Sequence, residues 1–241
     1  MANFFVDKDA FLQDPIVIEG EEANHITKVL RMSVGDELCV FDTEGSCADG
    51  IIESVEGKKV FVNVTKRYKS ETEPKLKITL FQGIPKNPKM DLIIQKATEL
   101  GVVKIVPVNT KRIVAKIDKE NKLERLRRIA FEAAKQCGRA YIPKVEDPIS
   151  FDEALEQMST MDAAIIPYEC EKNGKLSNHV TEGMNTLGII IGPEGGFEET
   201  EVKKAIQIGV KPVTLGRRIL RTETAGLIAS ALCLYIAGDM D

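Results

Sequence analysis

Two short stretches near the carboxyl end hold the residues whose types and spacing could do chemistry. The first is IGPEGGF, residues 191–197, where an apolar run ends in glycines, a proline and Glu194. Glycine tolerates a positive φ and lets another molecule approach the backbone closely, whereas proline stiffens the chain and removes a donor. Such a loop could bind a ligand through its main-chain amides and carbonyls. An ordinary turn at the end of a strand is the other interpretation.

The spacing of the glycines restricts the class of ligand. Gly192, Gly195 and Gly196 do not form the G-x-G-x-x-G pattern of dinucleotide sites, and no Lys-Ser or Lys-Thr pair follows them as in a P-loop. The sequence therefore disfavours a dinucleotide or a nucleoside triphosphate. A site walled by backbone carbonyls and amides suits a flat heterocycle such as adenine.

The second stretch is LGRRILRTETAG, which packs the three arginines Arg217, Arg218 and Arg221 into a short segment. Their simplest interpretation is a solvated turn. Arg221 differs from the other two because it lies between apolar residues and residues that could cap a helix. A guanidinium is always charged and offers a planar fork of donors. We therefore favour a functional role for Arg221.

Helix capping competes with catalysis as the explanation of the residues after Arg221. Thr222 or Thr224 could cap the helix that follows. Glu223 would then lie in the first turn, near the positive end of the helix dipole. We favour capping over catalysis for Glu223 and Thr224.

The rest of the composition argues against several classes of site. Only two histidines occur, His25 and His179, far apart in the sequence, so a zinc site or a Ser-His-Asp triad lacks ligands and bases. The five cysteines form no C-x-x-C pair, which favours reduced thiols over a disulfide framework. We expect no metal site. The chemistry must come mainly from carboxylates, arginines, main-chain groups or a cofactor.

The charge pattern bears on the partner. A net charge of −4 over 241 residues argues weakly against nucleic acid, but local charge matters more than the sum. Residues 111–128 contain eight basic and three acidic side chains, so a basic excess is local to this segment.

No apolar run approaches the roughly 20 residues that span a bilayer, and the N-terminus lacks the features of a secretory signal. We expect a cytoplasmic protein without membrane contact.

The elements that must position these stretches fall into two parts. Up to about residue 70, short runs rich in β-branched and aromatic residues alternate with turn signals, which is typical of a small β-barrel. The predicted strands of this part are 36–42, 47–55 and 58–68. Residues 25–31 predict one short helix on which Ile26, Val29 and Leu30 share a face. A charged, proline-bearing linker is predicted at 71–75.

From residue 76 to residue 241, continuous apolar runs alternate with helical patterns. This alternation predicts an α/β domain with a parallel sheet covered on both faces. Predicted strands are 77–84, 102–108, 162–169, 185–192 and 211–216, and predicted helices are 87–101, 118–138, 150–158, 199–209 and 222–238. Ligands of such sheets bind beyond the carboxyl ends of the strands. The two stretches above, together with PYE at 167–169, lie at three such ends.

These motifs together resemble a known family. GPEGGF followed by EETEV, and then LGRRILRTETA, is similar to the bacterial 16S ribosomal RNA uracil-N3 methyltransferases. Further similar stretches are HITKVLRMSVGDEL (25–38), IIQKATELGV (93–102), RRIAFEAAKQCGRAYIP (127–143) and PYE (167–169). The resemblance covers essentially the whole chain. One departure is Ile113, which follows Arg112 where a serine is expected.

The resemblance implies a fold, a cofactor and partners. The fold is a PUA-like RNA-binding β domain over 1–70 and a SPOUT-class methyltransferase domain over 76–241, whose chain forms a trefoil knot. The cofactor is S-adenosyl-L-methionine, and the partner is 16S ribosomal RNA of the small ribosomal subunit. The family works as homodimers with the active site near the dimer interface. The cofactor-binding residues that the resemblance implies are Pro167, Tyr168, Glu169, Ile191, Gly192, Pro193, Gly195, Gly196, Leu215, Gly216, Ile219 and Leu220.

The chemistry that the family performs suggests roles for two charged residues. Uracil N3 reacts as the anion, whose charge spreads onto O2 and O4, so cationic donors are needed at those oxygens. Arg221 is our first choice for that donor. Glu194 could accept the N3 proton or hold the arginine, and a pKa raised by burial would help it as an acceptor. The alternative is that Glu194 only caps backbone amides.

Contacts to RNA are expected from the helix at 122–139 and from the small domain. The predicted contacts are Arg31, Lys86, Arg112, Arg128, Gln136 and Arg139, although each cation alone is more often a solvated surface charge. Two other functions stay open. One is a non-catalytic RNA-binding assembly factor with the same fold, and the other is a ribose 2′-O methyltransferase.

Overall fold

The computed structural model describes residues 2–86, 88–115, 117 and 120–240. Contacts within the chain group it into two compact units. The first comprises residues 1–73 and 134–142, and the second comprises residues 74–133 and 143–241. The predicted domain limits place one boundary at 71–75. In the structure, residues 134–142 also belong to the first unit, so these limits stay a prediction.

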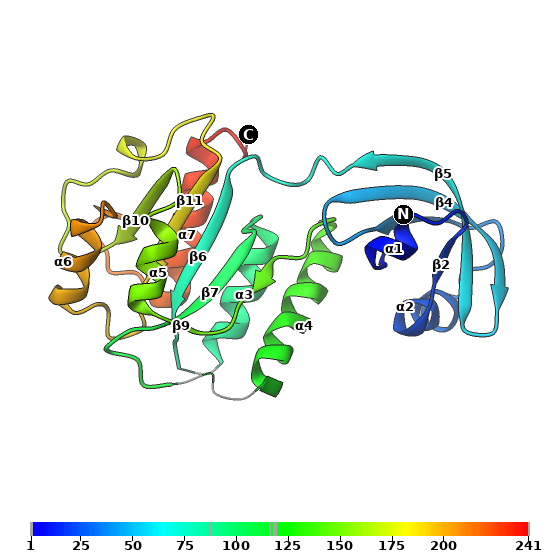
Figure 1. Ribbon diagram of the computed structural model, residues 1–241, viewed down its shortest axis with the longest axis horizontal. Helices are drawn as coiled ribbons and strands as arrows, with labels where there is room; N and C mark the ends of the chain where they lie inside the picture. Colours follow the sequence, from blue (N-terminus) through cyan, green and yellow to red (C-terminus); the bar gives the residue numbers. More distant parts are fainter. Residues whose placement is uncertain (1, 87, 116, 118–119, 241) are drawn as a thin grey trace. The chain divides into compact units, whose positions relative to one another are not determined.

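A five-stranded sheet forms the centre of the first unit (Figure 1). Its order is β1 (Ala2–Phe5), β3 (Glu37–Phe41), β4 (Ser46–Glu56), β5 (Lys59–Lys69) and β2 (Ile16–Ile18). β1 lies parallel to β3, and the other neighbours are antiparallel. Phe4, Ile16, Leu38, Ile52 and Val62 are fully or almost fully buried in one cluster. The predicted small β domain is therefore confirmed, and the short strands β1 and β2 are additions to it.

Two short helices, α1 (Lys8–Phe11) and α2 (Gly20–Asn24), accompany this sheet. α2 continues into one π-helical turn over His25–Val29. The predicted shared face is wrong, since Ile26 is buried while Val29 and Leu30 are exposed. The wider i→i+5 turn changes which side chains lie above one another, and the sequence carries no sign of it.

The second unit is built on a parallel sheet, as predicted. Its main path is β12 (Lys211–Val213), β10 (Ala163–Pro167), β11 (Thr186–Ile191), β6 (Lys77–Gly83), β7 (Lys104–Asn109) and β8 (Lys144–Val145). The short strand β9 (Ile149–Ser150) also pairs with β7. All of these pairs are parallel. The knot that the resemblance implies concerns the path of the chain and stays a prediction.

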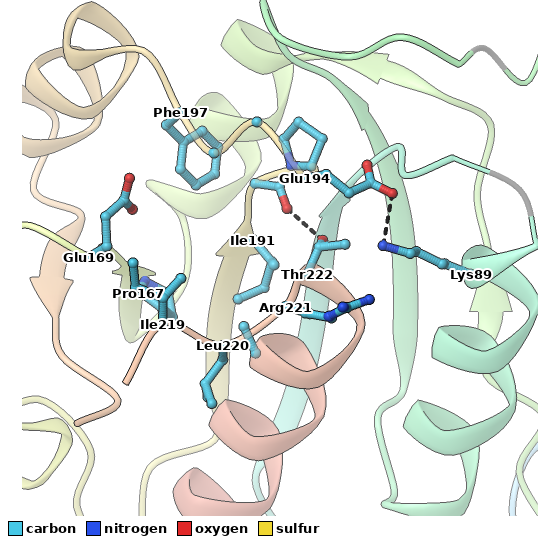
Figure 2. A pocket seen from close by; sticks show the side chains of 15 residues that line it. Lys89, Pro167, Glu169, Ile191, Glu194, Phe197, Ile219, Leu220, Arg221 and Thr222 are labelled. Carbon is cyan, nitrogen blue, oxygen red and sulfur yellow. Dashed lines mark hydrogen bonds and ion pairs between the residues drawn. The ribbon is translucent and has the colours of Figure 1, made fainter. Parts of the chain in front are cut away.

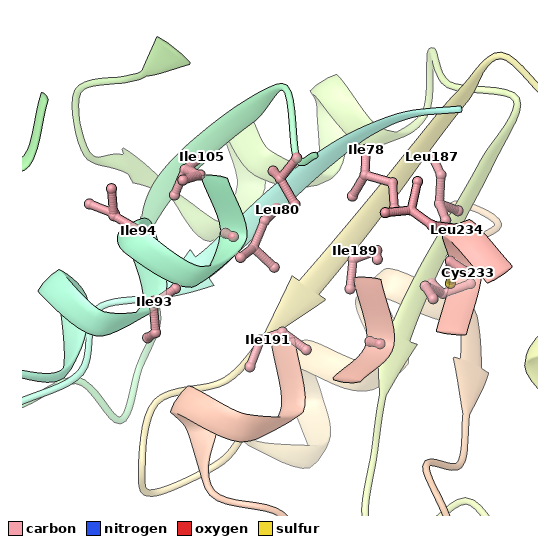
Figure 3. Packing of buried hydrophobic residues seen from close by; sticks show 14 of the residues in the cluster. Ile78, Leu80, Ile93, Ile94, Ile105, Leu187, Ile189, Ile191, Cys233 and Leu234 are labelled. Carbon is pink, nitrogen blue, oxygen red and sulfur yellow. The ribbon is translucent and has the colours of Figure 1, made fainter. Parts of the chain in front are cut away.

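Helices cover both faces of this sheet. α3 (Lys89–Glu99), α4 (Glu120–Cys137) and α7 (Thr222–Ile236) contribute side chains to one buried cluster, and α5 (Phe151–Met158) and α6 (Glu199–Gln207) contribute to the other. Figure 3 shows strand residues such as Leu80 and Ile189 against α3 and α7. Fully burying one such side chain contributes roughly 1.5–3 kcal/mol. These two clusters stabilise the sheet, and the sheet in turn positions the loops at the ends of its strands.

Local signals explain where several helices begin. Ser150 and Glu153 form the capping box of α5, and Glu198 and Glu201 form a similar one at α6. Residue 87 and residues 118–119, at the start of two predicted helices, lie outside the described residues. In the part of the chain that the structure describes, no helix has both the length and the apolar character needed to cross a membrane.

Candidate functional site

The strands of the second unit end together at one edge of the sheet. Ile191, the last residue of β11, pairs with Gln82 near the end of β6. Pro167, the last residue of β10, pairs with Val213, the last residue of β12. Because the strands are parallel, the loops that leave them meet at this edge, where ligands of open α/β sheets bind.

A cavity of about 440 Å³ lies at this edge (Figure 2). This volume falls within the roughly 300–1,000 Å³ of small-molecule sites. Its walls are Lys89, Pro167, Glu169, Ile191, Gly192, Pro193, Glu194, Gly195, Gly196, Phe197, Ile219, Leu220, Arg221, Thr222 and Ala225. A smaller cavity of about 110 Å³ shares some of these residues and adds Tyr168, Leu215 and Gly216, with Arg217 and Arg218.

The structure brings the predicted site residues together. Every residue predicted for the cofactor lines one of the two cavities, and Arg221 and Glu194 both line the larger one. The strand ends singled out in the sequence therefore share one site. The individual roles in cofactor binding and catalysis stay predictions.

Close contacts between main-chain segments explain why glycine occurs in and beside the loop after β11. A Cβ on Gly83, at the end of the neighbouring strand β6, would lie 2.8 Å from Pro193 Cδ of the loop, and a Cβ on Gly192 within the loop would lie 3.1 Å from the carbonyl carbon of Gly196. Gly196 has a φ of +65°, a conformation that other residues rarely adopt. One side of the loop packs against the end of β6, and residues 192–196 line the cavity.

Thr222 ties the start of α7 to this loop. Its Oγ1 donates to the Gly192 carbonyl oxygen at 2.6 Å and accepts from Gln82 Nε2 at 2.9 Å. The predicted capping role of Thr222 or Thr224 is wrong, since Arg221 occupies the N-cap position and no side chain caps the helix there. Thr222 is instead the first helical residue, and its buried hydroxyl links β6, the loop and α7.

An ion cluster lies at the cavity wall opposite Glu169 (Figure 2). Lys89 Nζ is 3.1 Å from Glu194 Oε1 and 3.2 Å from Glu223 Oε2. The backbone N–H of Lys86 also donates to the Glu194 carboxylate, at 3.1 Å to one oxygen. The hydrogen bond to Glu194 is the largest cause that raises the pKa of the Lys89 amine above its usual value, and Glu223 adds to it.

The electrostatics of Glu194 follow from these contacts. Burial raises the pKa of the Glu194 carboxyl, but hydrogen bonds from its own amide, from Lys89 and from the Lys86 amide outweigh burial and hold the pKa below its usual value. The burial-raised pKa that would suit a proton acceptor is therefore absent. Glu194 does cap a backbone amide, which was the alternative interpretation.

The two arginines near the loop have different surroundings. Arg112 Nη1 donates to the Gly195 carbonyl oxygen at 2.9 Å, so this predicted RNA contact also supports the loop. Arg221 is exposed at the cavity and, among the described residues, its guanidinium has no hydrogen bond or ion pair. Arg221 is thus a cation that is free to meet a ligand.

The other predicted RNA contacts are distributed over both units. Lys86, Arg128, Gln136 and Arg31 have exposed side chains. Arg139 is different, because only 3% of it is exposed and its Nη2 donates to Glu73 Oε2 at 2.6 Å. This ion pair gives Arg139 a structural role inside the first unit and removes the basis for predicting it as a phosphate contact. The sequence did not show that the end of α4 packs into that unit.

Several residues of the site were missed by reading the sequence. Lys89 and Gln82 act through contacts between segments that are far apart along the chain, and so does Thr222, which the sequence marked only as a possible helix cap. No motif marks Lys89, and a glutamine inside an apolar strand was the only available signal for Gln82. Across the described ranges, no group of three or more His, Cys, Asp or Glu side chains is arranged to hold a metal ion.

Comparisons with known proteins agree with this site. The sequence model of the RNA methyltransferase domain matches residues 72–234, and that of the RNA methyltransferase PUA domain matches residues 18–65. The ribosomal RNA small subunit methyltransferase E of Bacillus subtilis is 37% identical over 228 residues, which cover 90% of this chain and 89% of that protein. The protein of the same name from Mesomycoplasma hyopneumoniae is 34% identical, with 97% and 99% covered.

A solved structure supports the same relationship. The ribosomal RNA small subunit methyltransferase E of Neisseria gonorrhoeae, bound to S-adenosyl methionine, superposes with a TM-score of 0.88. It is 30% identical, and the match covers 100% of both chains. The resemblance seen in the motifs is thereby confirmed. With its PUA domain, its parallel-sheet domain and its cavity at the strand ends, the chain belongs to the RNA methyltransferase family and is a relative of the ribosomal RNA small subunit methyltransferases E.

Proposed function

We propose that this chain transfers the methyl group of S-adenosylmethionine to N3 of a uridine in 16S ribosomal RNA of the small subunit. The observation that carries the proposal is the cavity in which the GPEGG loop meets the segment before α7, with a free arginine at its wall. The relatives named small subunit methyltransferases support the RNA substrate. A neighbour bound to S-adenosyl methionine supports the cofactor.

The residues of the two cavities fit this cofactor. Main-chain groups of residues 192–196 can pair with the edge of an adenine, and Ile191, Ile219 and Leu220 offer apolar surface to its faces. Glu169 is the carboxylate on the β10 side of the larger cavity and can accept from hydroxyl or ammonium groups. When bound, S-adenosylmethionine supplies an electrophilic methyl group on a sulfonium.

Arg221 is proposed as the group that stabilises the uracil anion. Its guanidinium lines the cavity without an internal partner, so its donors can reach O2 or O4 as negative charge develops there. Glu194 is proposed to hold the loop rather than to accept the proton, because its contacts with Lys86 and Lys89 keep it ionised and a weak base.

The proposal includes a homodimer. Ile228, Leu232 and Tyr235 form an exposed apolar stripe along α7 at helical spacing, and Leu92 is exposed on α3, which packs against α7. Ile219, beside the cavity, is 85% exposed. Such a stripe beside a ligand site supports an interface between two copies. We place the protein in the cytoplasm, where ribosomal RNA is modified.

Contacts to RNA are proposed for the exposed cations. Lys86 and Arg112 flank the loop after β11, and Arg128 lies on α4 with Gln136 further along the helix. Arg31 is the candidate from the first unit. Phosphate contacts of this kind predict that binding weakens steeply as salt is added.

Two measurements on purified protein test the proposed function. Calorimetric titration with S-adenosylmethionine should show binding, and the absence of binding would favour the non-catalytic assembly factor.

Methyl transfer to 16S RNA should then fall about 100-fold or more in Arg221→Ala while cofactor affinity changes little, since removing one preorganised donor costs about that much. Arg221→Lys keeps the charge and should be intermediate. A rate near wild type in a dimeric, cofactor-binding Arg221→Ala preparation would refute the role of Arg221.

A further inference from the structure

Among the described residues that line the larger cavity, Lys89 is the cation that bridges two carboxylates. It opens α3, its side chain is 26% exposed, and its Nζ lies 3.1 Å from Glu194 and 3.2 Å from Glu223. The two carboxylates come from the GPEGG loop and from the first turn of α7, the two segments that enclose the site. A single ammonium therefore joins three elements at the cavity wall.

Without Lys89 the two carboxylates would lack a common counter-charge. Within the described part of the chain, Glu223 Oε2 is buried and has no hydrogen-bond partner apart from its ion pair with Lys89. From the same residues, Glu194 would retain the Lys86 amide and its own amide. The Glu194 and Glu223 side chains, which are 28% and 16% exposed, would then repel other anions that form nearby.

The charges of the described residues that line the cavity around the cluster come from several elements. Lys89 comes from α3, Glu223 and Arg221 come from the start of α7, and Glu194 comes from the loop. Glu169 lines the far side of the same cavity, and the Arg112 guanidinium is bound to the Gly195 carbonyl oxygen. Lys89 and Arg221 thus balance Glu194 and Glu223, and removing Lys89 leaves an excess negative charge beside Arg221.

We propose that Lys89 is a positioning residue for methyl transfer, which holds Glu194 and Glu223 together and balances their negative charge so that the substrate anion can form beside Arg221. This inference rests on the proposed function. Lys89 acts through its contacts with the two carboxylates and through the electrostatic potential in the cavity. It is not the proton acceptor, because its contacts hold the amine in the charged form.

The signature of this role is the pH dependence of the reaction. If N3 reacts as the anion, the rate rises with pH until the bound uracil is ionised. An extra negative charge close to the site opposes ionisation and moves that rise to higher pH. The displacement is on the order of one pH unit, since a charge within a few ångströms shifts a pKa by that amount or more. At neutral pH the rate then falls about tenfold, and it recovers as pH is raised.

The experiment measures single-turnover methyl transfer from S-adenosylmethionine to 16S RNA against pH. We expect the rate of Lys89→Met to rise at higher pH than the rate of wild type, while its Kd for the cofactor stays within about threefold of wild type. Lys89→Arg, which keeps the charge, should show the wild-type pH dependence. The matched control is Lys96→Met on the same helix, which removes the ion pair of Lys96 with Glu99 at 2.7 Å and should leave the profile unchanged.

A second readout does not depend on turnover. Carbon-13 NMR titration of the glutamate carboxyls should show a higher pKa of Glu194 in Lys89→Met than in wild type, because the Lys89 ammonium is one of the contacts that lower it. Unchanged carboxyl titrations, or a Lys89→Met rate that is reduced equally at every pH, would overturn the inference and leave a structural role. A wild-type protein that transfers no methyl group to RNA at any pH would instead reject the proposed function, so the two failures are distinguishable.

Discussion

Gly196 shows how one backbone angle shapes the cavity. Its φ of +65° turns the GPEGG loop, and a Cβ there would lie 3.4 Å from Glu169 Oε1. That distance is an ordinary contact, so the positive φ is what disfavours other residues at this position. A methyl group there would also take up space in the cavity that Gly196 lines.

Replacement of Gly196 separates the strain on the backbone from the effect on the cavity. Gly196→Ala should lower the free energy of unfolding by about 1–2 kcal/mol, the cost of a left-handed conformation for other residues, and should also weaken S-adenosylmethionine binding. Gly209→Ala is the matched control, since Gly209 has a φ of +99° with nothing within 4 Å of its Cβ. It should lose similar stability in a denaturant titration and keep wild-type cofactor affinity. Equal affinities in both variants would contradict the account.

Single residues also mark the limit of what the sequence could predict. The residues that line the cavity could be named because they follow strands in a parallel sheet and match a family pattern. Lys89 could not, because its importance comes from two glutamates more than 100 positions away, which only the fold brings within 3.2 Å. Arg139 was taken as an RNA contact because its partner Glu73 lies 66 positions away along the chain.

At the scale of elements, the start of α7 is held to the strand ends by one hydroxyl. Thr222 is 6% exposed and bonds both to the Gly192 carbonyl and to Gln82 on β6. Removing this hydroxyl leaves a buried carbonyl and a buried amide without that partner. The loop and the segment carrying Arg221 would then lose their common anchor.

Thr222→Val tests this anchor, because the side chain keeps its shape and loses only the hydroxyl. Unfolding free energy should fall by about 1–3 kcal/mol, the cost of leaving buried polar groups unpaired, and cofactor affinity should fall with it. Ser230→Ala serves as the control, since the Ser230 hydroxyl is equally buried but donates within its own helix to Gly226. We expect Ser230→Ala to leave cofactor affinity unchanged. Loss of affinity in Ser230→Ala, or none in Thr222→Val, would count against the anchor.

The predictability of the elements follows from their physics. Strands of the parallel sheet are buried on both faces, so β6 and β11 appear as continuous apolar runs. The capping box of α5 appears directly as Ser150 and Glu153. β1 and β2 were missed because strands of four and three residues carry too little pattern. The π turn after α2 was missed because hydrophobic spacing in the sequence assumes an α-helical period.

At the scale of the whole molecule, the account includes an assembly of two copies. The apolar stripe of α7 is exposed in the single chain, although it adjoins the segment that lines the cavity. An interface there would cover the stripe and place the second copy close to the site. Assembly and activity should then be lost together.

Leu232→Glu tests the assembly by placing a charge in the middle of the stripe. Light scattering coupled to size-exclusion chromatography should show a shift from dimer to monomer, because burying an unpaired carboxylate is costly. Ile206→Glu is the matched control, as Ile206 is 46% exposed on α6, away from α7. A wild-type monomer, or a Leu232→Glu dimer as stable as wild type, would disprove this interface.

The central claim, methylation of a uridine at N3 in 16S ribosomal RNA, is tested most directly by mass mapping of modified nucleotides. Ribosomal RNA from cells that lack this protein should be compared with RNA from cells that contain it. The account predicts that one N3-methyluridine of 16S RNA is lost, and that wild-type protein restores it while Arg221→Ala does not. An unchanged 16S modification pattern, or the loss of a ribose 2′-O-methyl group in its place, would contradict the claim.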